Sequence, residues 1–165
     1  MAKALAPPSS TKLLYEEDFP LWAERQAALL RAARFEELDL DNLIEEVEDL
    51  SRRERKSVEG YVETIVEHLL KLAVSPSKRP RRGWLVTVDK QRLKLSRELT
   101  MTLRSHLQAE LPALYEGLRR PLARQLEKDG VRPDALPAVC PYTLDQILDL
   151  NWYPRNMHGI DDPTL

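Results

Sequence analysis

Five polar side chains fall on one face of a helix that the sequence predicts between about residues 40 and 75. On an ideal helix they lie within about 60° of one another, on the same side as the apolar seam. These residues are Glu54, Ser57, Tyr61, Thr64 and His68. Because carboxylates and imidazoles are the usual proton carriers near neutral pH, this face could hold a ligand or an acid–base site.

Two further polar residues, Arg92 and His106, reach this face from the next predicted helix. If the intervening turn is centred near residue 80, antiparallel pairing places Glu54 close to His106 and His68 close to Arg92. The seven residues then form a candidate buried polar network. We favour the interpretation that such groups are satisfied within the core and set the register of the two helices, or that a bend exposes them.

Neither histidine belongs to a metal-binding motif of the di-iron bundle type, which needs Glu-x-x-His on facing helices. Ile65 and Leu103 stand three residues before His68 and His106. The chain also has no Gly-x-Ser-x-Gly elbow and no Gly-rich phosphate loop, and Cys140 is expected to be packed. The sequence therefore predicts no metal and no cofactor, and an enzyme using His68 or His106 is the least favoured alternative.

Cationic side chains cluster with one aromatic residue at a proline-containing loop and the start of the following helix. This candidate anion or nucleic-acid patch consists of Lys78, Arg79, Arg81, Arg82 and Trp84. Phosphate contacts by the cations, with bases stacked on Trp84, are a known mode of nucleic-acid binding. The acidic sequence pI of 6.0 favours another interpretation, in which the cations pair with acidic segments and Trp84 anchors the core.

Apolar residues recur at helical spacing along the chain, and the helices that this spacing predicts would position the candidate residues. They are predicted over about residues 18–34, 39–75, 84–106, 112–130 and 143–148. Pro121 is expected to break the fourth, and Thr143 with Gln146 forms a capping box on the last. We favour one continuous or gently kinked helix over 39–75, although Ser51 could begin a separate helix. The predicted fold is all-α, a helical bundle around a long antiparallel helix hairpin with shorter flanking helices.

A chain of 165 residues, 42% hydrophobic and 32% charged, is long enough for one domain with its own core. We expect residues 15–154 to form that domain, residues 1–14 to be a flexible tail and residues 155–165 to be loose. The lone cysteine excludes an internal disulfide, no apolar run could span a membrane, and no secretory leader is recognisable. The sequence therefore indicates a cytoplasmic protein.

The net charge of −2 hides a segregation of charge along the chain. Residues 16–50 contain twelve acidic and three basic side chains, whereas residues 78–104 contain nine basic and two acidic ones. Opposite charges on different segments can pair within one chain or between two chains, and the sequence leaves both possibilities open.

Four strings of residues, in this order along the chain, resemble a known family. They are Tyr15-Glu-Glu-Asp-Phe19, Leu40-Asp-Asn-Leu-Ile-Glu-Glu-Val-Glu48, His68-Leu-Leu-Lys71 and Cys140-Pro-Tyr-Thr-Leu-Asp-Gln-Ile-Leu148. Together they resemble the bacterial family called domain of unknown function 29, over about residues 15–154. One departure is Leu72, where the family often has Trp. The resemblance implies a small helical cytoplasmic protein and assigns no activity.

The length of the predicted hairpin suggests what its surface does. The hairpin exposes a larger apolar and charged surface than the short flanking helices can cover. Pairing with a second copy of the chain would cover that surface without any other partner. We therefore predict a protein-interaction or regulatory module acting as a homo-oligomer, most simply a dimer, with an unknown protein partner. The main alternative is a nucleic-acid-binding accessory protein that uses the basic loop at 78–84.

Overall fold

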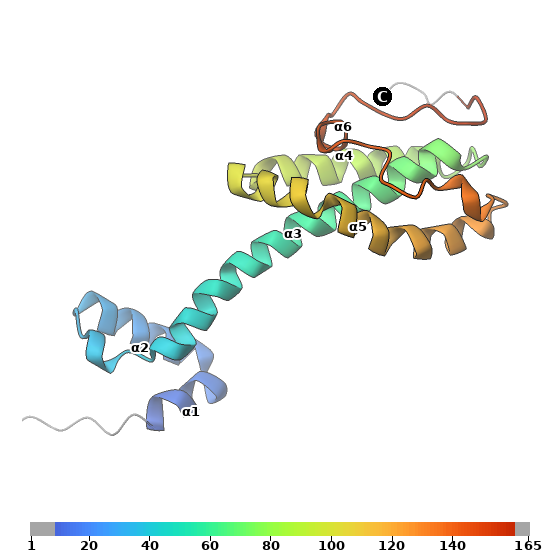
Figure 1. The fold of residues 1–165 in the computed structure, drawn as a ribbon. Coiled ribbons are helices and arrows are strands. Elements are labelled where there is room, and N and C mark those ends of the chain that lie inside the picture. Colours follow the sequence, from blue (N-terminus) through green and yellow to red (C-terminus); the bar gives the residue numbers. More distant parts are fainter. Residues whose placement is uncertain (1–8, 161–165) are drawn as a thin grey trace, which may run out of the picture. The chain divides into compact units, whose positions relative to one another are not determined.

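The computed structural model describes residues 9–160 and is helical throughout its regular structure, with no strand in that part of the chain (Figure 1). The α-helices are α1 (Ser9–Glu17), α2 (Phe19–Arg31), α3 (Leu40–Val74), α4 (Arg81–Glu98), α5 (Met101–Glu127) and α6 (Leu144–Leu148), and two 3₁₀ turns, η1 (Phe35–Glu37) and η2 (Pro133–Ala135), lie between them. The predicted all-α class is confirmed.

The chain divides into two compact units, residues 1–53 and 54–165, where the sequence analysis treats residues 15–154 as one domain. Helix α3 contributes its beginning to the N-terminal unit and the rest to the C-terminal unit. It is one helix of 35 residues, as predicted, and neither Ser51 nor Gly60 interrupts it.

The N-terminal unit is organised around Trp22 of α2. Asp18 caps this helix as predicted, since its side chain accepts a hydrogen bond from the Leu21 N–H at 3.1 Å. The Trp22 indole N–H donates to the buried Asp39 carboxylate at 3.2 Å, and the Asp39 N–H donates to the Gln26 side-chain carbonyl at 2.9 Å. These bonds tie the segment before α3 to α2.

Helix α1 begins at Ser9, inside the range 1–14 for which the sequence predicts a flexible tail. That prediction rests on the lack of a periodic apolar signal and on the residues Pro7, Pro8, Ser9 and Ser10. Residues 1–8 lie outside the described part of the chain.

The C-terminal unit has one core, made by apolar side chains of α3, α4, α5 and α6. Figure 1 shows α4 and α5 beside the later turns of α3, which is the predicted antiparallel hairpin with an added helix. Members from the helices include Val62, Ile65, Leu69, Leu95, Leu107 and Ile147. The predicted capping box at the start of α6 is present, with Thr143 and Gln146 bonded to each other's backbone.

The boundary between α4 and α5 differs from the prediction of helices over 84–106 and 112–130. Helix α4 ends at Glu98, and Thr100 caps α5 by accepting a bond from the Leu103 N–H at 3.2 Å. Helix α5 then continues through Pro112 and Pro121 without a break. Both prolines are exposed, so water can reach the carbonyls that lose their N–H partners.

The end of α3 is closed by residues that the sequence analysis expects to be loose. The Asn156 side-chain amide donates to the carbonyls of Leu72 and Ser75 at 2.7 and 3.0 Å. The Met157 N–H donates to the Ala73 carbonyl, and His158 to that of Val74. Residues 156–158 thus replace the missing helical partners of four successive carbonyls, from Leu72 to Ser75. Residues 161–165 lie outside the described part of the chain.

Candidate functional site

The N-terminal unit exposes most of its large apolar side chains. Among its described residues, only Trp22 and Leu29 are buried hydrophobics. The exposed ones are Leu13, Phe19, Leu21, Leu30, Phe35, Leu40, Ile44, Val47 and Leu50. The last four belong to α3 and follow helical spacing, so they form a stripe on one side of the helix, hereafter the α3 stripe.

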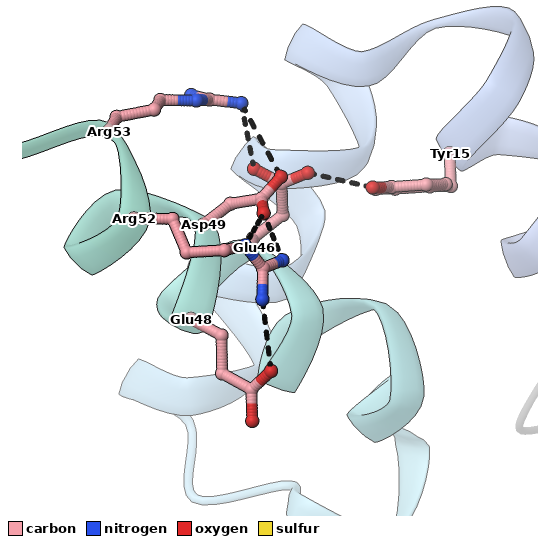
Figure 2. Close-up of polar contacts among 6 residues, drawn as sticks. All are labelled: Tyr15, Glu46, Glu48, Asp49, Arg52 and Arg53. Carbon is pink, nitrogen blue, oxygen red and sulfur yellow. Dashed lines mark hydrogen bonds and ion pairs between the residues drawn. The ribbon is translucent and has the colours of Figure 1, made fainter. Parts of the chain in front are cut away.

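Acidic residues accompany the α3 stripe and are partly organised by ion pairs (Figure 2). Glu46 accepts a hydrogen bond from the Tyr15 hydroxyl at 2.7 Å, and this bond raises the pKa of Tyr15 to about 12. Arg53 lies 4.0 Å from Glu46 and 3.9 Å from Asp49. Such solvated pairs add little stability, but they fix the directions in which these side chains point.

Arg52 completes this cluster from the next turn of α3. Its guanidinium bonds to Asp49 and lies 3.4 Å from Glu48, as Figure 2 shows. Glu45 on the same helix is exposed and has no ion pair in the described chain. The first turns of α3 therefore present an apolar stripe on one side of the helix and a surplus of negative charge on its other sides.

The predicted basic patch is not one continuous exposed surface. Lys78, Arg79 and Arg82 are exposed, whereas Arg81 is buried at 3% exposure and Trp84 is half-buried. Three cations thus face water at the start of α4, and Arg81 belongs to the protein interior. Trp84 is only partly available for stacking on a base.

Helix α4 carries a second exposed face that the sequence analysis does not single out. Val86 and Leu93 are exposed and stand seven residues apart, which is two helical turns. Arg82, Lys90 and Arg97 share this side of the helix by the same spacing. None of the three makes an ion pair with any described residue.

The predicted polar network is distributed over separate places. The Ser57 and Tyr61 hydroxyls both donate to the carboxylate of Glu98, each at 3.0 Å, and Glu98 is a residue that the sequence analysis missed. Glu54 is exposed. Thr64 donates to the Gly60 carbonyl within its own helix. These groups form a partly solvated contact at the end of α4, so they do not enclose a ligand.

The two histidines lie in different environments. His106 pairs with Glu59 at 2.6 Å, and not with Glu54, because α5 begins anew after Glu98 and shifts the register. His68 donates from Nδ1 to the Thr64 carbonyl of its own helix at 2.8 Å. No bond joins either of them to Arg92. An acid–base pair of imidazoles is therefore absent from the described hairpin.

Arg92, the remaining member of the predicted network, is 2% exposed and holds the C-terminal segment. Its guanidinium donates to the carbonyls of Ile147, Gln146 and Trp152 at 2.8, 3.0 and 2.9 Å. It also lies over the Tyr153 ring, 5.0 Å from the centroid. Burial lowers the pKa of this guanidinium, and the carbonyls around it compensate for its desolvation.

The chain matches the sequence model of the family described as Domain of unknown function DUF29 over residues 14–153. It belongs to the DUF29 family. A comparison with curated proteins finds no match, and neither does a comparison with solved structures. The family description assigns no activity, so the function of this DUF29 chain has to be argued from its own surfaces.

Two general features limit the kinds of site that this DUF29 chain presents. Between residues 9 and 160, no helix is both long and apolar enough to cross a membrane. In the same stretch, no group of three or more His, Cys, Asp or Glu side chains is arranged to hold a metal ion. The remaining candidate sites are two surfaces with exposed apolar side chains, the α3 stripe and the exposed face of α4.

An open cavity of about 260 Å³ lies against α5 in the C-terminal unit. It is lined by Pro112, Tyr115, Glu116, Arg119, Arg120, Ala138, Val139 and Cys140. Burial raises the pKa of the Cys140 thiol, whose sulfur lies 3.5 Å from the Tyr142 carbonyl. A raised pKa reduces the thiolate fraction at neutral pH, so Cys140 is a poor nucleophile.

Alkylation of Cys140 tests this conclusion. In the folded protein at pH 8, iodoacetamide is expected to modify the thiol about tenfold more slowly than in the urea-unfolded chain, because burial limits both thiolate and access. Mass spectrometry of timed samples gives both rates, and Cys140 is the only cysteine. Equal rates in the two states would show that the thiol is activated and would reopen the cavity as a reactive site.

Proposed function

We propose that this DUF29 protein is a protein-interaction or regulatory module of the bacterial cytoplasm that acts as a homodimer. The supporting observation is the imbalance of the N-terminal unit, with nine large apolar side chains exposed and two buried among its described residues. A unit of this size has difficulty in forming a stable core alone, and association is one common remedy. The α3 stripe is the part of this surface with a regular arrangement.

The size of the exposed surface is sufficient for this role. Apolar patches above roughly 400 Å² mark interaction sites on soluble proteins. Burying that much surface is worth on the order of 10 kcal/mol, which is comparable to the cost of bringing two molecules together. Side chains of the N-terminal unit that are each about half exposed can supply such an area when they are covered by a partner.

Light scattering coupled to size exclusion tests the proposal. We expect the unaltered chain to have twice the mass of a monomer at micromolar concentration, and Val47→Glu to be monomeric, because a carboxylate in the centre of the stripe would be desolvated on association. Val47 is 65% exposed, so the substitution leaves the monomer fold intact.

Val139→Glu is the matched control for that experiment, since Val139 is 73% exposed but belongs to the other unit. It is expected to keep the dimer. A monomeric unaltered chain would contradict the proposal, and so would a dimer that Val47→Glu leaves at full strength.

Nucleic-acid binding is a second candidate, supported by the three exposed cations at the start of α4. Lys78, Arg79 and Arg82 have no ion pair in the described chain. Reversal of these three to Glu should abolish a salt-sensitive mobility shift, if one exists, while Arg81 is left intact because it is buried. A shift that survives the triple reversal, or no shift at low salt, would exclude this surface as a nucleic-acid site.

A further inference from the structure

The open cavity beside α5 combines apolar lining residues with two arginines that have no ion-pair partner. Its apolar lining includes Pro112, Ala138 and Val139, and its cationic lining consists of Arg119 and Arg120. Neither arginine makes an ion pair with any described residue, and Arg119 is half-buried. A guanidinium that is partly withdrawn from water and unpaired favours an anion beside it.

The charges around the cavity have a positive surplus. Glu116 is the one acid of the lining, so two arginines against one glutamate leave a net charge of +1. Burial and the neighbouring Cys140 raise the pKa of the Tyr115 hydroxyl, whereas the positive charge of Arg119 lowers it. Since Tyr115 is itself a lining residue, the charge of Arg119 acts within the cavity.

The wall formed by residues 138–140 is fixed to α5 by the chain's own contacts. The Tyr115 hydroxyl donates to the Pro137 carbonyl at 2.7 Å, directly before this wall begins. The backbone N–H groups of Ala138 and Val139 bond to no described residue, so the wall also has free hydrogen-bond donors. A site that is held in place without its ligand loses less conformational freedom when the ligand binds.

We propose that this cavity binds a small organic carboxylate, with the carboxylate on Arg119 and Arg120 and the apolar body of the ligand against Pro112 and Val139. Its volume of about 260 Å³ is slightly below the roughly 300–1,000 Å³ of sites for drug-sized molecules, which suits a small ligand. The planar guanidinium matches the two oxygens of a carboxylate, and the apolar lining favours an organic anion over inorganic phosphate. The site lies in the C-terminal unit, so this inference does not rest on the proposed homodimer.

Titration of the isotope-labelled protein with benzoate, followed by NMR, is the test. Benzoate carries a carboxylate on an apolar ring. We expect saturable shifts in the amide signals of residues 115–120 and 138–140, with benzyl alcohol and inorganic phosphate each binding at least about tenfold more weakly. Benzyl alcohol that binds as tightly would overturn the role of the arginines, and phosphate that binds as tightly would overturn the assignment to an organic ligand.

Substitutions in the lining locate the binding. Arg119→Gln with Arg120→Gln should weaken benzoate binding about tenfold or more, because charge-assisted hydrogen bonds are lost. Arg124→Gln with Lys128→Gln removes the same charge from exposed positions outside the lining, and this matched control should bind benzoate like the unaltered chain. Val139→Glu keeps both arginines and, at a position 73% exposed, keeps the fold, yet its carboxylate beside them should also abolish binding.

The outcomes decide this inference separately from the proposed function. The absence of saturable shifts around the cavity in the unaltered chain would overturn it, and so would equal weakening by the matched control. Loss of binding in the two lining variants alone supports it. None of these substitutions alters the α3 stripe, so the mass of each variant in light scattering reports on the homodimer whatever the titration shows.

Discussion

Arg92→Met is expected to lower the free energy of unfolding by about 3 kcal/mol or more. The substitution removes the donor of three hydrogen bonds to the carbonyls of Ile147, Gln146 and Trp152, of which the first is buried and the other two are partly buried. Methionine keeps much of the side-chain volume, so the effect reports on the lost hydrogen bonds more than on a cavity. Urea unfolding followed by circular dichroism measures it.

The matched control is Arg124→Met on α5, where the arginine is exposed. Its effect should stay within about 0.5 kcal/mol. Hydrogen exchange should also rise in residues 144–153 of the Arg92 variant, because these residues lose their attachment to α4. An Arg92 variant as stable as the control would show that the C-terminal segment is held by apolar packing alone.

Trp22→Ala is expected to destabilise the N-terminal unit by about 3–5 kcal/mol. Trp22 is one of two buried hydrophobics in the described part of this unit, and its ring centroid lies 4.8 Å from that of Tyr15 and 5.5 Å from that of Phe19. Its loss also leaves the buried Asp39 carboxylate without the indole N–H. Amide hydrogen exchange should show fast exchange in α2 and protected amides in α5.

Two further variants make the Trp22 result interpretable. Trp22→Phe keeps an aromatic ring but removes the N–H, and it should cost about 1–2 kcal/mol. Met101→Ala, at a position 79% exposed in the C-terminal unit, should have an effect near zero. If Trp22→Ala left exchange in α2 unchanged, the N-terminal unit would not depend on this core.

Most of the helical architecture follows from periodicity and capping. The spacing of apolar residues predicts α2, α3 and α6, and Asp18 and Thr143 mark two of the starts because their side chains cap the first N–H groups. The break between α4 and α5 was missed because residues on both sides of it keep helical spacing. Thr100 caps the second helix, a signal that could have been found in the sequence.

The candidate surfaces were harder to predict, since apolar spacing does not say which residues a partner covers. Leu40 and Val47 continue the same stripe as Val58 and Ile65, yet the first pair is exposed and the second is buried. Likewise, Glu98 is the last residue of α4 and accepts bonds from two α3 hydroxyls, a contact 37 and 41 residues apart in the sequence that periodicity does not indicate. In both cases the outcome depends on packing between residues that are far apart in the sequence.

The closure of α3 by Asn156 and His158 has a consequence for the order of events during synthesis. The carbonyls of Leu72 and Val74 receive their partners from residues 84 positions later in the chain. At about 5–20 residues per second, a ribosome needs roughly 4–17 s to add that stretch. During this interval the last carbonyls of the nascent helix can bond only to water, so the final turn of α3 is completed by the end of synthesis and not by its own sequence.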